Sequence, residues 1–307
     1  MAAARDSAKI AVEVGGRRLQ LSNLDKVLYP DTGFTKGEVI DYYSRIAPVL
    51  LPHLADRAAT RVRFPDGVEG NSFFEKNVPK GTPDWVRTVT LPTPGSSTGR
   101  ETLEFVVVED LPTLIWLANL AALELHVHQW TVGPRGGVHG VNRLVFDLDP
   151  GAPAALRHCA QVALLLRDVL DDLGLECLAK TSGSKGLQLY VGLVETPAER
   201  AHGFARDLAV AMEAEHPTLI VHRMDKALRT GKVLIDWSQN AAAKTTVAPY
   251  SLRARARPTV STPLTWDEVA EAADGRDIAF TAPEVLDRVE EVGDLFAPLL
   301  DPTGVLP

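Results

Sequence analysis

The pattern of residues 144–151, LVFDLDPG, constrains the fold of this chain more than any other segment. In a β-strand successive side chains point to opposite faces, so Asp147 and Asp149 project side by side while Phe146 and Leu148 point the other way. Two carboxylates so close repel each other unless one keeps a proton or a cation lies between them. A divalent cation is the usual partner of such a pair. The segment therefore predicts a strand that is buried on one face and carries a metal site on the other.

A third acid, Asp236, ends the apolar run KVLID and could join this pair from a neighbouring strand. Three carboxylates on adjacent strands could hold two divalent cations about 4 Å apart, the arrangement used for phosphoryl or nucleotidyl transfer. Taken alone, the D-x-D pair also fits solvated or turn-forming acids. The metal hypothesis therefore depends on further motifs.

The segment KTSGSKGLQLYV, residues 180–191, supplies a second motif. Ser182 to Gly186 form a small-residue turn between two predicted strands, where successive backbone N–H groups can cradle phosphate oxygens and Lys185 adds a positive charge. The spacing is not that of a P-loop, and the turn opens a strand instead of a helix. An ordinary hairpin turn is the alternative.

The charge of the chain is distributed unevenly, which bears on nucleic acid as a partner. The formal net charge is −8, but residues 258–307 hold 11 acidic residues against two arginines, a net of −9. Residues 222–257 hold eight lysines and arginines against two aspartates. A basic surface for phosphates is therefore compatible with an acidic protein, and a solvated charged face is the alternative.

Aromatic and cationic residues near the N-terminus suit a nucleic-acid site. Phe73 and Phe74 are adjacent in a predicted strand and must face opposite sides, so one can enter the core while the other stacks on a base. Two core side chains are the alternative. Lys26 and Lys36 flank a predicted turn.

Polar residues after the KVLID run and in LELHVHQW complete the candidate site. Gln239, Lys244 and Arg253 follow without hydrophobic periodicity, and such groups suit a triphosphate and a nucleobase beside a metal centre. Because no further zinc ligands are apparent near His126 and His128, the sequence favours a hydrogen-bonded role for His126 and a surface position for His128.

Periodicity and capping signals predict an α+β chain without internal repeats. We expect one compact unit over residues 1–307, with the acidic helical segment 258–307 packed beside it. The predicted helices are 23–30, ended by Pro30; 39–51, capped by Thr35 and Glu38 and bent or ended by Pro48; 111–125; 152–173; 197–215; 265–273; and 282–292. The predicted strands are 11–14, 17–21, 59–64, 72–76, 102–108, 144–149, 176–180, 187–193, 218–222 and 232–237.

Several protein classes are excluded by composition. No apolar run approaches the ~20 residues of a membrane span, and the first residues lack the apolar core of a signal peptide, so the sequence predicts a cytoplasmic protein without a membrane partner. Cys159 and Cys177 are the only cysteines, too few for a disulfide framework or a Cys-rich zinc module. We expect both to be buried.

In combination, FDLDPG, SGSKG and VLIDWSQN…KTTVAPYSLR, together with LSNLDKVLYP, FFEK and LELHVHQW, resemble the bacterial primase-polymerase family that includes the LigD polymerase domain. The resemblance runs from about residue 19 to residue 253 in consistent order and spacing. It implies an archaeo-eukaryotic primase-type α+β core, with mixed and antiparallel sheets flanked by helices. It also implies addition of NTPs or dNTPs with two Mn²⁺ or Mg²⁺ ions, at gapped or broken DNA that carries a 5′-phosphate.

The resemblance assigns roles to residues at matching positions. Asp147, Asp149 and Asp236 are implied as metal ligands, with His126 close to the reacting atoms. The residues implied in nucleotide binding are Ser182, Ser184, Lys185, Gln188, Arg229, Gln239, Lys244 and Arg253. Those implied in DNA binding are Asn23, Lys26 and Lys36, which grip the downstream 5′-phosphate, Arg61 and Arg63, and Phe73 or Phe74, which stacks on the template.

Two positions depart from the family pattern. The usual SGSKGLH appears here as SGSKGLQ, so Gln188 replaces a histidine; an amide can donate a hydrogen bond but carries no charge. Val62 stands where relatives often have a lysine. Both departures could alter the rate or the nucleotide preference, and neither touches the three carboxylates.

The sequence contains no K-x-D-G ligase motif, so we expect a stand-alone primase-polymerase that fills gaps in excision repair or end joining. A DNA ligase acting in trans, and a Ku-like protein, are the implied protein partners. A non-catalytic module that binds gapped DNA and recruits a ligase is the alternative. A two-metal nuclease or phosphohydrolase is a third class, against which the SGSKG turn argues.

Overall fold

The computed structural model describes residues 9–93 and 99–307. The strands are β1 (Ile10–Val14), β2 (Arg17–Leu21), β3 (Val27–Tyr29), β4 (Phe34–Thr35), β5 (Ala58–Arg63), β6 (Phe73–Glu75), β7 (Thr88–Pro92), β8 (Thr102–Val107), β9 (Ala122–Val127), β10 (Trp130–Val132), β11 (Val138–Pro150), β12 (Cys177–Thr181), β13 (Leu187–Thr196), β14 (Ile220–Val221), β15 (Val233–Asp236), β16 (Thr246–Val247) and β17 (Pro263–Leu264). The helices are α1 (Lys36–Leu54), α2 (Leu111–Asn119), α3 (Leu156–Asp172), α4 (Ala198–Glu215), α5 (Trp266–Ala273) and α6 (Ala282–Val292), with short 3-10 helices at Lys226–Leu228, Trp237–Asn240 and Ala297–Leu300.

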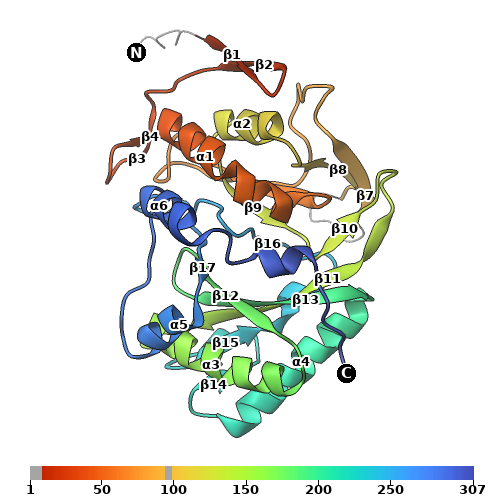
Figure 1. Cartoon of the computed structure of the whole chain (residues 1–307), viewed down its shortest axis with the longest axis vertical. Helices are drawn as coiled ribbons and strands as arrows, with labels where there is room; N and C mark the ends of the chain where they lie inside the picture. The colour runs from red at the N-terminus through yellow and green to blue at the C-terminus, as the bar shows by residue number, and fades with distance from the viewer. Residues whose placement is uncertain (1–8, 94–98) are drawn as a thin grey trace.

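Two large sheets organise the chain (Figure 1). One has seven strands in the order β14-β15-β11-β13-β12-β17, with β10 paired to β11. The other has six strands in the order β16-β9-β5-β8-β7, with β6 paired to β5. The β14-β15 pair is parallel and the pairs that β11 makes are antiparallel. The predicted α+β fold, with mixed and antiparallel sheets flanked by helices, is confirmed.

Apolar faces hold the helices against the sheets. In the lower half of Figure 1, α3 and α4 cover one face of the seven-stranded sheet, against which Leu144, Phe146 and Leu148 of β11 are fully buried. In the upper half, α1 and α2 pack with the six-stranded sheet. Burying one such side chain stabilises the fold by about 1.5–3 kcal/mol. On the other face of β11, Val145 packs with Tyr190, Phe296 and Leu299, and the polar residues Asp147 and Asp149 follow towards the end of the strand.

Two helix predictions, those for residues 23–30 and 111–125, are wrong, and tertiary contacts explain both. Residues 23–30 form a turn and strand β3 instead of a helix, because both Leu28 and Tyr29 are fully buried and β3 pairs with β4. Helix α1 continues past Pro48 to Leu54, since its apolar face is buried along its whole length. The predicted helix 111–125 ends at Asn119, and its last residues form β9 between β5 and β16.

Other local predictions are confirmed. The predicted strands 11–14 and 17–21 form the β1-β2 hairpin, which turns at Gly15 and Gly16, and Thr35 and Glu38 form the predicted capping box of α1. Cys159 and Cys177 are both buried. Among residues 9–93 and 99–307, no helix combines the length and apolar character that crossing a bilayer requires.

Asp294 anchors the C-terminal segment to α1. Its carboxylate lies 2.8 Å from His53 Nε2, and it accepts hydrogen bonds from the Tyr250 hydroxyl (2.7 Å) and the Phe296 N–H (2.9 Å). These donors lower the pKa of Asp294 although burial raises it. The carboxylate is therefore ionised, mostly buried and fully hydrogen-bonded.

We expect Asp294→Asn to lower the free energy of unfolding by about 2 kcal/mol, because an amide cannot satisfy all three donors and leaves buried groups unpaired. Chemical denaturation monitored by circular dichroism measures this change. Glu290→Gln is the matched control, because the Glu290–Arg45 pair is exposed and 3.4 Å long, and its loss should cost less than about 0.5 kcal/mol. Equal effects of the two substitutions would contradict the anchoring role.

Candidate active site

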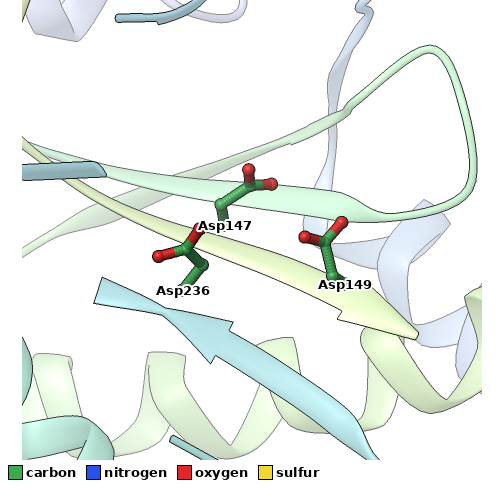
Figure 2. A group of neighbouring side chains, drawn as sticks. All are labelled: Asp147, Asp149 and Asp236. Carbon is green, nitrogen blue, oxygen red and sulfur yellow. The ribbon is translucent and has the colours of Figure 1, made fainter. Parts of the chain in front are cut away.

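Strand β11 places two carboxylates on one face of the seven-stranded sheet, as the alternation predicts. Phe146 and Leu148 are buried on the helix side, whereas Asp147 and Asp149 point away from the helix below the strands in Figure 2. Strand β15 pairs with β11 so that Asp236 lies directly opposite Asp147. The structure therefore brings together the three acids identified in the sequence.

The three carboxylates form one cluster, in which each offers an oxygen within 4.8 Å of the others. In the described part of the chain, this is the only such group of three or more His, Cys, Asp or Glu side chains. Asp236 is held in place by the N–H and hydroxyl of Ser238 (3.0 and 2.6 Å) and by the amide of Gln239 (2.7 Å). Carboxylate oxygens accept more than one bond, so Asp236 can still bind a metal ion.

The close approach of three carboxylates in this cluster favours the binding of a cation. Burial, followed by the charge of Asp149, raises the pKa of Asp147 to about 7. Burial and the charge of Asp236 also raise the pKa of Asp149. Positive charge beside Asp147 and Asp149 would favour the ionised form of both. Because carboxylates are the ligands that Mg²⁺ and Mn²⁺ prefer, the residues fit a divalent-metal site.

The SGSKG turn joins β12 to β13 and lies beside the acid cluster. The Ser182 hydroxyl accepts hydrogen bonds from the N–H groups of Ser184 (3.3 Å) and Gly186 (3.2 Å), which fixes the turn. Gly183 has a φ of +66°, and a Cβ on Gly186 would lie 2.1 Å from the carbonyl oxygen of Leu148. Glycine is therefore required for the turn to approach β11 this closely.

Asp147, Asp149 and the turn line one cleft of about 380 Å³, whose walls come from both large sheets. Asp236 clusters with the two acids but is not part of the cleft lining. Arg229 and Lys244 do not line it: Arg229 donates to the carbonyl of Met224, and Lys244 is exposed. The charge of Arg229 nevertheless lowers the pKa of Asp149. The predicted site residues that do line the cleft are Phe74, His126, Asp147, Asp149, Ser182, Ser184, Lys185, Gln188, Gln239 and Arg253.

Glu124, which the sequence analysis missed, links two of these residues. Its carboxylate lies 2.9 Å from His126 Nε2 and 3.1 Å from Arg253 Nε, and it accepts a hydrogen bond from the Ala254 N–H. Burial raises the pKa of Glu124, but the hydrogen bond with His126 and the charge of Arg253 lower it further, to about 2. Alternation along LELHVHQW could have found this residue, because Glu124 and His126 lie two positions apart in one strand.

A second group of cations gathers around Lys36. The side chain of Lys36 is only 5% exposed, and its Nζ donates to the carbonyl of Ser22 at 2.6 Å. Burial, and then the charges of Lys26 and Arg63, lower the pKa of Lys36 to about 8. Asn23 begins the adjoining turn, with a φ of +55° and its carbonyl bonded to the Lys26 N–H. An anion at this cluster would relieve the repulsion among its cations.

Arg61 departs from its predicted role. Its side chain is 1% exposed and donates to the Glu75 carboxylate (2.8 Å) and to the carbonyl of Asn77 (2.7 Å). The guanidinium is buried and its charge is already paired with the Glu75 carboxylate, so the predicted contact of Arg61 with DNA is corrected. Arg63 is half-buried and shares Glu75 at 3.0 Å. The two arginines thus brace the β5-β6 pair.

Two aromatic predictions also need correction. Phe73 and Phe74 are 49% and 60% exposed, so neither enters the core; β6 is a short edge strand with no helix over it. Phe74 lies edge-on to His126, with ring centroids 6.3 Å apart. His128 is buried instead of exposed, because it stacks on Trp130 and bonds the carbonyl of Ala58.

Comparison with known proteins identifies this architecture. Residues 35–296 match the family described as LigD, primase-polymerase domain. The chain belongs to this family. It is 47% identical over 284 residues to the multifunctional non-homologous end joining protein LigD of Mycolicibacterium smegmatis, and 34% identical over 278 residues to the bifunctional LigD of Bacillus subtilis. These matches cover 92% and 90% of this chain but only 36% and 43% of the relatives, so the chain spans less than half their length.

The fold agrees with a solved LigD structure. The polymerase domain from Mycobacterium tuberculosis Ligase D, in complex with DNA, superposes with a TM-score of 0.87 at 42% identity, covering 94% of this chain and 99% of that one. As a LigD-type primase-polymerase, the chain is a nucleotidyltransferase.

Proposed function

We propose that this LigD-type domain is a template-directed polymerase of DNA repair, acting on gapped or broken duplex DNA that carries a downstream 5′-phosphate. It adds NTPs or dNTPs to a primer 3′-hydroxyl. The observation that carries the proposal is that Asp147 and Asp149, which cluster with Asp236, line one cleft of about 380 Å³ together with the SGSKG turn. The names of the relatives support a role in end joining, and the DNA complex of the M. tuberculosis domain supports DNA as the partner.

Different residues of the site perform different parts of nucleotidyl transfer. When bound at the three carboxylates, two Mn²⁺ or Mg²⁺ ions supply the charge that activates the primer 3′-hydroxyl and neutralises the departing pyrophosphate. Lys185 and Ser184 of the SGSKG turn hold the triphosphate oxygens, and Arg253, which donates to the carbonyl of Ser182 in the same turn, adds a second cation. Gln239 holds Asp236 in place. Attack of the 3′-oxygen on the α-phosphorus then breaks the bond to pyrophosphate.

The DNA is held at two further places. We assign the downstream 5′-phosphate to Lys26, Lys36 and Asn23, with Arg63 contributing charge. Asp66 pairs with Lys26, and Glu75 pairs with Arg63. Lys36 instead donates to a backbone carbonyl, so its charge is left for a phosphate. We assign template stacking to Phe74, which is exposed and lies at the cleft beside His126.

Extension of a labelled primer across a short gap tests the proposal. Substrates with and without the downstream 5′-phosphate are compared in Mn²⁺ and in Mg²⁺, with ribonucleotides and with deoxynucleotides. Extension that is faster on the phosphorylated gap supports it. Shortening of the DNA without added nucleotides would indicate a nuclease, and binding without extension would indicate a module that recruits a ligase.

We also propose the setting in which the enzyme works. The polypeptide acts as one polymerase unit in the cytoplasm, at the nucleoid. A DNA ligase seals the filled gap, and a Ku-like end-binding protein is a second candidate partner. Co-purification with gapped DNA and each candidate protein tests these partners; failure to form a complex would exclude them.

Glu124→Gln should lower kcat/KM for nucleotide addition about tenfold. The neutral amide weakens the hold on Arg253 and His126, and losing a charge-assisted hydrogen bond costs about 1.4 kcal/mol. Steady-state extension kinetics measure the effect. Glu75→Gln is the control, because Glu75 also pairs with arginine but lies outside the cleft lining. If Glu75→Gln lowered kcat/KM as much as Glu124→Gln, the proposed role of Glu124 in holding Arg253 and His126 would be contradicted.

A further inference from the structure

Four side chains of different character lie in one row across the seven-stranded sheet. In the registers of the antiparallel pairs, Asp236 of β15 is opposite Asp147 of β11, Asp147 is opposite Gln188 of β13, and Gln188 is opposite Lys180 of β12. Directly opposite residues share one face of a sheet and interact. The row therefore runs from two metal-binding acids, through an amide, to a buried cation.

Lys180 has an unusual environment for a lysine. Its side chain is fully buried, and its Nζ lies 2.6 Å from Gln188 Oε1 and 2.5 Å from Ser261 Oγ. The Ser261 hydroxyl donates its own hydrogen to the carbonyl of Thr181, so its oxygen can only accept from Lys180. Among the described residues, the hydrogen-bond partners of Lys180 are therefore an amide oxygen and a hydroxyl oxygen, not a carboxylate. A buried cation is normally paired with a carboxylate.

The position of Lys180 decides how Gln188 presents its amide. Oxygen and nitrogen of a glutamine amide can exchange places unless neighbours distinguish them. Here Oε1 accepts from Lys180 and lies 3.5 Å from the Tyr190 hydroxyl, so the NH₂ group is left for the other side. On that side Asp147 lies directly opposite Gln188 across the β11-β13 pair, close enough for the amide to interact with the carboxylate. An inverted amide would present its oxygen to Asp147 and repel it.

We propose that Lys180 is a positioning residue for the metal-binding carboxylate Asp147, acting through the Gln188 amide whose orientation it fixes. The inference rests on the metal-dependent transfer proposed above and adds a residue to it. It also accounts for glutamine at position 188: the amide donates to the acid, and the lysine behind it fixes and polarises the amide. Hydrogen-bond partners of metal ligands commonly set metal affinity in this way.

Titration with Mn²⁺ alone, followed by the electron paramagnetic resonance signal of free Mn²⁺, tests the inference without nucleotide or DNA. Lys180→Met keeps the length of the buried side chain but removes its donor. We expect it to weaken Mn²⁺ binding about tenfold, within the usual range for such supporting residues. Lys9→Met, which removes the same charge from an exposed position, should leave the affinity within twofold. Unchanged affinity in a folded Lys180→Met variant would overturn the proposal.

A double-mutant cycle separates orientation from simple charge loss. Gln188→Leu alone should weaken Mn²⁺ binding about tenfold, and adding Lys180→Met to it should change the affinity less than twofold, because the amide is already gone. If the double variant instead lost Mn²⁺ affinity by the product of the two single losses, the inference would be overturned, because Lys180 would then act without Gln188. If Lys180→Met fails to fold, the Mn²⁺ affinity of Gln188→Leu provides the test. An unchanged affinity in that variant would contradict the proposal, and tenfold weaker binding would support it. Wild-type protein that binds no Mn²⁺ would instead refute the metal-dependent function itself.

Discussion

Asp147→Asn is expected to lower the rate of nucleotide addition by at least about a thousandfold, the largest effect we predict for a single substitution. Asp147 lies opposite Asp236 and shares with it and Asp149 a cluster in which every carboxylate has an oxygen within 4.8 Å of the others. Replacing one carboxylate by an amide removes a full negative charge where two divalent cations must bind. A thousandfold loss corresponds to about 4 kcal/mol of transition-state stabilisation.

Single-turnover extension of a primer across a phosphorylated gap measures this rate, with DNA affinity measured in parallel by fluorescence anisotropy. The affinity should stay within threefold of the wild type, because the cations of the Lys36 cluster are untouched. Asp168→Asn is the matched control: Asp168 is an exposed carboxylate on α3, paired with Arg167, and its loss should leave the rate unchanged. An Asp147→Asn variant that extends primers at the wild-type rate would remove the basis of the proposed mechanism.

The parts of the site that could be predicted from sequence are those that local periodicity determines. The two-residue alternation of LVFDLDPG placed Asp147 and Asp149 on one face, and the small residues of SGSKG predicted a tight turn beside them. The capping box of α1 was predictable for the same reason, since its atoms lie within one turn of helix. Each of these features depends on residues close together in the chain.

Features that arise from pairing between distant segments could not be predicted in the same way. The burial of Arg61 follows from the β5-β6 pairing, and residues 122–127 form strand β9 because β5 and β16 flank them. The row that links Lys180 to Asp147 depends on the registers of three strand pairs, which no local pattern specifies. The resemblance to a family identified most of the cleft residues, but it carried no information on Glu124 or Lys180.

The second large effect is expected at Lys36: Lys36→Met should reduce the preference for a 5′-phosphorylated gap about a hundredfold. The Lys36 ammonium is almost fully buried beside Lys26 and Arg63, where a phosphate would meet several cations away from bulk water. Charge-assisted hydrogen bonds in such surroundings contribute about 1.5–3 kcal/mol each, and a hundredfold corresponds to about 2.7 kcal/mol. The ratio of the Kd values for phosphorylated and unphosphorylated gapped DNA measures this preference.

The pH dependence of that ratio provides an independent check. The Lys36 pKa of about 8 means that the free protein holds the ammonium at pH 7 and has lost most of it at pH 9. Phosphate binding favours the charged form, so the preference should fall about tenfold between pH 7 and pH 9 in the wild type. In Lys36→Met the ratio should not change over this range, while Lys9→Met should behave as the wild type. A wild-type ratio that stays constant from pH 7 to pH 9 would show that Lys36 does not bind the phosphate.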